Sequence, residues 1–82
     1  MITLRMFASV REAAGRPSDE FEASDVEGLL SLARARYGVG FESLLHLCAI
    51  TVNGRNVEAA LGLATRLNDG DEVALLPPVS GG

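Results

Sequence analysis

The chain has no lysine, and this absence limits the chemistry of its side chains. Its seven basic residues are all arginine, so no side chain can form a Schiff base or accept an isopeptide bond from another copy. The single cysteine, Cys48, excludes an internal disulfide and a four-cysteine metal or iron–sulfur site. No segment approaches about 18 consecutive apolar residues, and the N-terminus lacks the apolar run of a signal peptide. We therefore expect a soluble, cytoplasmic protein with no membrane partner.

The size and charge of the chain narrow the class of protein further. Its 82 residues correspond to one domain, and the 48% hydrophobic content is enough for a single core. The net charge is −4, and no run of like charges stands out. We expect no nucleic acid partner, and an electropositive protein groove is the more suitable binding surface for such a chain.

The first ten residues alternate between apolar and polar side chains, which predicts a half-buried strand with these residues on one face: Ile2, Leu4, Met6, Ala8 and Val10. Phe7 breaks the pattern, because its phase places it on the outer face with Arg5. Gly15 and Pro17 indicate a loop over residues 11–17. Residues 19–23 then predict a short returning strand that completes a hairpin.

One helix is strongly indicated by its cap and its apolar stripe. Ser24 and Glu27 have the spacing of a capping box, in which each side chain accepts from the backbone N–H of the other. Gly38 fits the left-handed position that ends a helix. The pattern predicts a helix over residues 25–37 whose buried face is formed by Val26, Leu29, Leu30, Ala33 and Tyr37.

The second half of the chain indicates a hairpin and a final strand. Residues 49–53 predict a strand, Asn53-Gly54 is a strong signal for a tight hairpin turn, and residues 55–57 return. Asn68-Asp69-Gly70-Asp71 predicts a turn that leads into a last strand over residues 72–76.

Two segments are less clearly defined by their sequence. Residues 41–47 are apolar at helical spacing but few, which indicates one turn of helix or an ordered loop. Residues 58–66 fit no single element, although we expect Leu61 and Leu63 to pack under the sheet.

These elements predict an α+β domain in which a mixed sheet of four or five strands packs on one main helix, residues 25–37. A helix with one apolar stripe covers one sheet face, and the other face stays in water. If the first and last strands are neighbours, Phe7 and Leu76 point outward together. They would then form an exposed apolar patch, which is typical of a partner-binding surface, although two scattered surface hydrophobic residues are a second reading.

No group of residues in the folded part has the composition of a catalytic site. His46 has no second ligand or neighbouring carboxylate, and Cys48 enters an apolar strand, as buried inert thiols do. The acidic turn around Asp69 and Asp71 lacks the ligand series of a calcium loop. We expect the folded part to bind no cofactor or metal and to catalyse nothing alone.

The last six residues, 77–82, have a composition suited to a stiff, narrow tail. Pro77 and Pro78 hold the backbone extended, and six extended residues reach roughly 20 Å. Gly81 and Gly82 have no Cβ, so a terminal carboxylate there is unhindered and the backbone fits a narrow channel. A frayed chain end is the alternative reading.

The residues at both ends of the chain resemble those of the MoaD/ThiS family of ubiquitin-like sulfur carriers. The resemblance rests on Phe7-Ala8-Ser9-Val10-Arg11-Glu12 followed by Gly15, and on the sequence from Leu67 to Gly82. It covers the whole chain in length and element order. It implies a β-grasp domain over residues 1–76 and an extended tail over residues 77–82.

The resemblance also implies a function for the tail. A MoeB-type activating enzyme, using ATP and Mg²⁺, would adenylate the Gly82 carboxylate, and sulfur would then convert it to a thiocarboxylate. The tail would enter a MoaE-like large subunit in a heterotetramer, where the sulfur is transferred to cyclic pyranopterin monophosphate to make molybdopterin. Besides Gly82 and Gly81, the implied partner contacts are Phe7, Arg11, Leu76, Pro77, Val79 and Ser80.

Three alternative functions stay open from the sequence. The chain could be a carrier of the same fold that serves thiamin thiazole or cysteine synthesis, although Pro77-Pro78 and the Phe7–Gly15 segment favour MoaD. It could be a ubiquitin-like modifier that attaches its C-terminus to lysines of other proteins. It could also be a β-grasp interaction module with no chemistry, which would not need terminal glycines.

Overall fold

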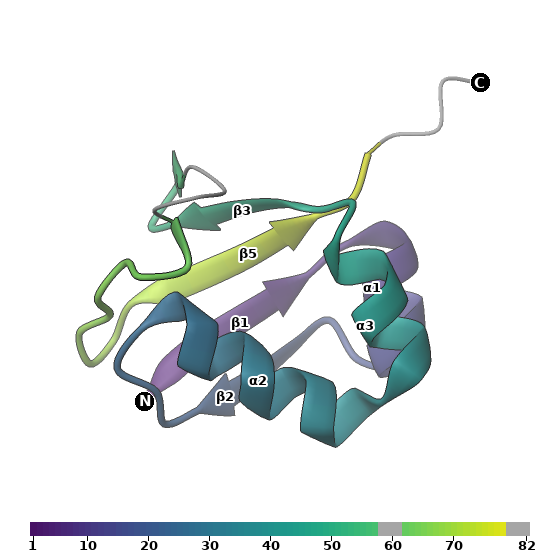
Figure 1. The fold of residues 1–82 in the computed structure, drawn as a ribbon, viewed down its shortest axis with the longest axis horizontal. Helices are drawn as coiled ribbons and strands as arrows, with labels where there is room; N and C mark the ends of the chain where they lie inside the picture. The colour runs from purple at the N-terminus through teal and green to yellow at the C-terminus, as the bar shows by residue number, and fades with distance from the viewer. Residues whose placement is uncertain (58–61, 79–82) are drawn as a thin grey trace.

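The structure of the chain is a computed structural model that describes residues 1–57 and 62–78. The elements within these ranges are β1 (Ile2–Met6), α1 (Ala8–Ala14), β2 (Ser18–Phe21), α2 (Val26–Tyr37), α3 (Val39–Leu45), β3 (Ala49–Val52), β4 (Arg55–Asn56) and β5 (Glu72–Leu76). Figure 1 shows the strands forming one twisted sheet, with the N-terminus and the departing C-terminal segment at opposite ends of the molecule.

The five-stranded sheet is mixed and has the order β2-β1-β5-β3-β4. Strands β1 and β5 are parallel neighbours at its centre, with Met6 opposite Leu75. The other pairs are antiparallel. The first and last strands are therefore neighbours, which is the condition set for Phe7 and Leu76 to lie together, and both central strands end at the same edge of the sheet.

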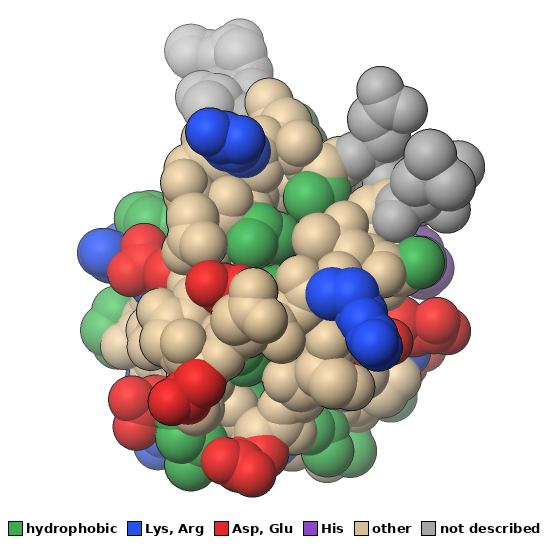
Figure 2. All heavy atoms as spheres, turned by 90° about the vertical axis from the view of Figure 1, so that its left-hand side faces the viewer, with side chains coloured by type: hydrophobic (Ala, Val, Ile, Leu, Met, Phe, Trp, Pro, Cys, Tyr) green, Lys and Arg blue, Asp and Glu red, His purple; other side chains and the backbone are tan. Residues whose placement is uncertain are grey.

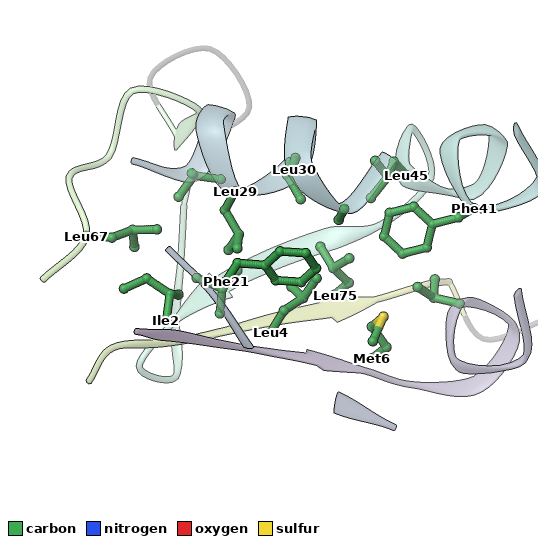
Figure 3. Packing of buried hydrophobic residues seen from close by; sticks show 14 residues of the cluster. Ile2, Leu4, Met6, Phe21, Leu29, Leu30, Phe41, Leu45, Leu67 and Leu75 are labelled. Atoms are coloured by element: carbon green, nitrogen blue, oxygen red, sulfur yellow. The ribbon is translucent and has the colours of Figure 1, made fainter. Parts of the chain in front are cut away.

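The core lies between the sheet and the helices α2 and α3, as Figure 3 shows. The inward residues of β1 and β5 alternate with exposed or half-buried ones, as period-two burial requires. The α2 residues Val26, Leu29, Leu30 and Ala33 are buried, which confirms the predicted stripe, with Tyr37 half-buried at its end. This arrangement is the ubiquitin-like β-grasp fold, so the predicted α+β class is confirmed.

The predicted strand over the first ten residues is wrong beyond Met6. The chain turns at Ala8, whose φ is +50°, and then forms α1 where a strand end and a loop were expected. The alternating pattern was misleading because Val10 is apolar and in phase with the strand, but it is buried as part of helix α1. Gly15, with φ +78°, ends α1 and donates its N–H to the Arg11 carbonyl. The pairing of β1 with β2 is confirmed, but a helix connects the two strands and they form no tight hairpin.

The predicted capping box at the start of α2 is also wrong. The cap is Asp25, whose carboxylate accepts from the Gly28 N–H at 2.7 Å. The backbone N–H of Glu27 donates to the Leu63 carbonyl instead, at 2.8 Å. The Asp25 carboxylate thus caps the helix, a role that was expected of the Ser24 hydroxyl.

The segment of residues 62–67 supplies the remaining acceptors at the start of α2. The Thr65 carbonyl accepts from Val26 at 3.1 Å, and the Leu63 carbonyl accepts from Glu27 at 2.8 Å. Leu67 is buried, while Leu63 is 40% exposed, so the expectation that Leu63 packs under the sheet is wrong. Leu61, the other residue of that expectation, lies outside the described residues. The segment was hard to assign because it caps a helix and forms little regular structure itself.

Residues 39–45 form a helix of about two turns, longer than the single turn or loop expected. Gly38, with φ +89°, ends α2 and also precedes α3, so it has the positive φ expected of it but not the left-handed ψ. Phe41 and Leu45, one turn apart, are both buried. Their i, i+4 spacing was the helical signal in the sequence.

The predicted Asn53-Gly54 turn is confirmed, with φ +51° and +84°. Asn53 also joins the turn to β5, because its amide donates to Asp71 at 3.0 Å and its oxygen accepts from the Glu72 N–H at 2.9 Å. Asp71 accepts further from the Asn68 N–H, and these hydrogen bonds lower its pKa. The acidic turn before β5 therefore has a structural use at the end of the molecule away from the tail.

A side chain at position 62, in place of the hydrogen of Gly62, is expected to destabilise the fold. A Cβ at this position would lie 2.9 Å from Cγ2 and 3.0 Å from Cβ of Val57. Gly62→Ala should therefore lower the free energy of unfolding by about 1–3 kcal/mol in urea titrations. Gly40→Ala is the matched control, because α3 leaves open space there and alanine should raise stability by up to about 1 kcal/mol. Equal effects of the two substitutions would contradict this reading.

Asp19 of β2 forms an ion pair and hydrogen bonds with residues at the end of α2. Its carboxylate accepts hydrogen bonds from Arg36 at 2.8 Å and from the Tyr37 hydroxyl, and Arg16 lies 3.4 Å away. Arg36 also stacks over the Phe21 ring at 4.3 Å. Burial opposes ionisation of Asp19, but the hydrogen bonds from Tyr37 and Arg36 outweigh it and lower its pKa to about 2. Burial and the hydrogen bond to Asp19 raise the pKa of Tyr37 to about 12.

This cluster predicts a pH dependence of stability. Because the pKa of Asp19 is lower in the folded chain, its stabilisation is complete above about pH 4 and is lost as the pH falls towards 2. Asp19→Asn should cost about 1–2 kcal/mol at pH 7, and the difference from the unsubstituted chain should shrink across this window. Chemical denaturation of both proteins from pH 2 to 7 measures it. A difference that does not change with pH would contradict the proposed ion pairing.

Candidate functional site

The tail begins where the central strand β5 ends, and Leu76 and Pro77 are called the root of the tail here. Strand β5 is paired on both sides, to β1 and to β3, and its inward residues Val73 and Leu75 are fully buried. Pro77, which follows directly, is half-buried, and Pro78 is exposed. Since a central strand is the least free to move, the sheet fixes the position and direction from which the tail departs. Figure 1 shows β5 leading directly into this segment.

The outer sheet face carries small or apolar side chains next to the tail and the charged Arg5 and Glu72 further back. The β5 residue of this face nearest the tail is Leu76, which is 38% exposed and lies opposite Ala49 of β3. One step back on the same face, Ala74 lies opposite Thr51 of β3 and Arg5 of β1. The face was not fully predictable, because Ala49 and Thr51 join it only through the register between β3 and β5.

Phe7 and Leu76 directly follow the paired residues Met6 and Leu75, so they lie at the same end of the central strands. Phe7 is half-buried at the start of α1, and the Arg5 guanidinium lies over its ring, 5.5 Å from the centroid. The apolar surface at this end therefore comes more from Leu76 than from Phe7. Alternation placed Arg5 and Phe7 on the same face, two residues apart, but it did not predict the contact between their side chains.

Arg11 lies in α1, not in the expected loop, and its side chain is exposed. Val79, Ser80, Gly81 and Gly82 lie outside the described residues. Of the residues predicted to contact a partner, the structure thus places Phe7, Leu76 and Pro77 at one end of the central strands.

Other reactive side chains are not assembled into a site. Burial raises the pKa of the Cys48 thiol, which donates to the Leu44 carbonyl at 3.3 Å, so the thiolate is disfavoured. His46 is exposed at the end of α3. In residues 1–57 and 62–78, no three His, Cys, Asp or Glu side chains are grouped to hold a metal ion.

The end of the molecule away from the tail has a different character. Figure 2, which views this end, shows acidic side chains spread over its surface. The N-terminal ammonium of Met1 forms an ion pair with Asp69, and a depression of about 570 Å³ beside it is lined in part by Glu22. The hydrogen bond to Asp69 raises the pKa of this amine.

A profile of the ThiS family matches residues 4–82. The chain belongs to the ThiS family. The resemblance to the MoaD/ThiS sulfur carriers is thus confirmed over nearly the whole length, including the middle of the chain that carries no recognisable motif. Within the part of the chain that the structure describes, no helix is both long enough and apolar enough to cross a membrane.

Three similar proteins show the range of the family. The molybdopterin synthase sulfur carrier subunit of Chlamydomonas reinhardtii is 37% identical over 99% of this chain and 98% of its own length. Small archaeal modifier protein 3 of Haloferax volcanii is 35% identical with the same coverage. A chain from the complex of subunits 1 and 2 of the molybdopterin-converting factor of Helicobacter pylori superposes with a TM-score of 0.75 at 30% identity, covering 99% of this chain and 97% of that one.

Proposed function

We propose that this chain is the sulfur-carrier subunit of a molybdopterin synthase. The Gly82 carboxylate attacks the α-phosphorus of ATP on an activating enzyme, which releases pyrophosphate and leaves an acyl adenylate. A donor of sulfide-level sulfur then forms a C–S bond at the carbonyl carbon as the C–O bond to AMP breaks, giving a thiocarboxylate and AMP with no change of oxidation state. The carboxylate needs this activation because it is a poor acyl donor until its oxygen belongs to a good leaving group.

The observation that carries the proposal is the parallel pairing of β1 with β5. It places the end of a fully paired central strand, with Leu76 and Pro77, next to the part of the outer sheet face that carries small and apolar side chains. A partner can hold this face while the tail enters its active site, so the carrier is positioned by a rigid surface. The similarity to a chain of the Helicobacter pylori complex supports a protein partner for this chain.

The chemistry after activation is assigned to the partners. The thiocarboxylate is a soft nucleophile, and two transfers would build the dithiolene on cyclic pyranopterin monophosphate in a MoaE-like large subunit. That subunit would supply the catalytic residues and the anion pocket, and a MoeB-type enzyme would bind ATP and Mg²⁺. Two copies of each subunit would form the working heterotetramer.

Attachment to other proteins is the second candidate function, favoured by the 35% identity to a small archaeal modifier protein. In that reaction a lysine amine of the target, not a sulfur donor, would displace AMP from the adenylate. Sulfur delivery to thiamin thiazole or to cysteine is the third, because it needs the same activated terminus.

Complementation separates these functions. Expression in strains that lack MoaD, ThiS or a carrier for cysteine synthesis should restore molybdoenzyme activity in the first strain alone. Growth restored only in the second or third strain would overturn the assignment to molybdopterin. Lysine-linked adducts of the chain in cell extracts, with no rescue of molybdoenzyme activity, would instead establish the modifier function.

A further inference from the structure

Arg5 stands at the centre of the outer sheet face, one residue pair behind Leu76. Its neighbours across the strands are both small, Ala74 on β5 and Ser18 on β2. The Arg5 side chain is therefore longer than those of its cross-strand neighbours, and it is about half exposed. It is the charged residue closest in register to the apolar end of this face.

The Arg5 guanidinium lies over the Phe7 ring and has only one long ion pair among the described residues. Its carbon lies 5.5 Å from the centroid of the Phe7 ring, which is the geometry of a cation–π contact. Its ion pair within the described residues is with Glu72, at 3.8 Å between Nη1 and Oε1, which exceeds hydrogen-bond length. A guanidinium has five N–H donors in a rigid fork suited to a carboxylate.

We propose that Arg5 receives a carboxylate from the acceptor subunit that docks on this face, in place of Glu72. The cation–π contact with Phe7 restrains the Arg5 side chain before binding, so less entropy is lost when a bidentate pair forms. The partner surface would then have an apolar group over Leu76 and an Asp or Glu over Arg5. On a chain of net charge −4, this local positive charge fixes the orientation of docking.

The inference rests on the proposed function, and calorimetric titration of the full chain with its MoaE-like large subunit tests both. Arg5→Glu should weaken binding by about 30-fold or more, and Arg5→Met, which keeps a stem over Phe7, by about 10-fold. Arg66→Glu is the matched control. The Arg66 backbone forms an isolated β-bridge with Asp25, the N-cap of α2, and Arg66 is not part of the outer sheet face, so this change should alter the Kd by less than about 3-fold.

Glu72→Gln gives the most specific result. If a partner carboxylate replaces Glu72 at Arg5, removing this internal competitor should tighten binding by about 2- to 4-fold. Weaker binding of Glu72→Gln, or equal losses for Arg5→Glu and Arg66→Glu, would overturn the role of Arg5 and leave the proposed function standing. Failure of the unsubstituted chain to bind the large subunit would overturn the proposed function and this inference with it. Thermal melts of each variant identify any loss of folding.

Discussion

Deletion of Gly81 and Gly82 is expected to abolish sulfur transfer without changing the stability of the folded domain. The reacting carboxyl would move back along the tail by roughly 7 Å, and a displacement of only about 1 Å can cost a factor of about 100 in rate. We therefore expect activity of the reconstituted synthase to fall by at least about 1,000-fold. The measurement is single-turnover formation of molybdopterin from the purified, activated carrier and the large subunit.

Two further variants separate tail length from tail sequence. Addition of two glycines after Gly82 should inactivate the chain as completely as the deletion, because it moves the carboxyl away from the reaction centre. Ser80→Ala keeps the length and removes one implied partner contact, so it should lower the activity far less than either change of length. Normal activity in the deletion or the extension variant would show that the carboxyl of Gly82 is not the reacting group.

Leu76→Asp is expected to have the second-largest effect, on docking. Leu76 is 38% exposed beside the tail, and a complex that covers this surface would bury an unpaired carboxylate in an apolar contact. The affinity for the large subunit should fall by about 100-fold in calorimetric titrations. The formation of the thiocarboxylate tests separately whether the activating enzyme uses the same face.

Leu32→Asp is the matched control for this prediction. Leu32 is exposed to a similar degree, 44%, but lies on α2, on the other side of the sheet. The same change of charge there should alter the Kd by less than about 3-fold. Equal losses for the two variants would mean that overall charge, and not the face around Leu76, governs binding.

The sequence was most informative where one periodicity applied without competition. The α2 stripe and the β5 alternation each follow a single period, and both elements occur within one residue of their predicted limits. The Asn53-Gly54 turn was equally clear, because positive φ at two successive residues restricts the residue types strongly.

The sequence misled where tertiary contacts decided the local structure. Ala8 has a positive φ that its own side chain disfavours, so the change from β1 to α1 depends on the packing of Val10 in the core. The start of α2 is completed by carbonyls from about 40 residues later, which no local cap rule describes.

The candidate site shows the same division. Leu76 and Pro77 could be placed from the tail and the last strand, since both are local features. Ala49 joins them through the β3–β5 register, and the stacking of Arg5 on Phe7 is a matter of side-chain geometry. A single sequence carries neither of these directly. Alternation placed Arg5 and Phe7 on the outer face, but the structure was needed to show that they are in contact.

The most direct test of the account is the intact mass of the chain after incubation with ATP, a sulfur donor and a MoeB-type activating enzyme. We predict a mass increase equal to the replacement of one oxygen by sulfur, located at Gly82 by fragmentation and absent when ATP is omitted. An unchanged mass, when the same enzyme converts a known sulfur carrier in parallel, would contradict the proposal that this chain carries sulfur on its C-terminus.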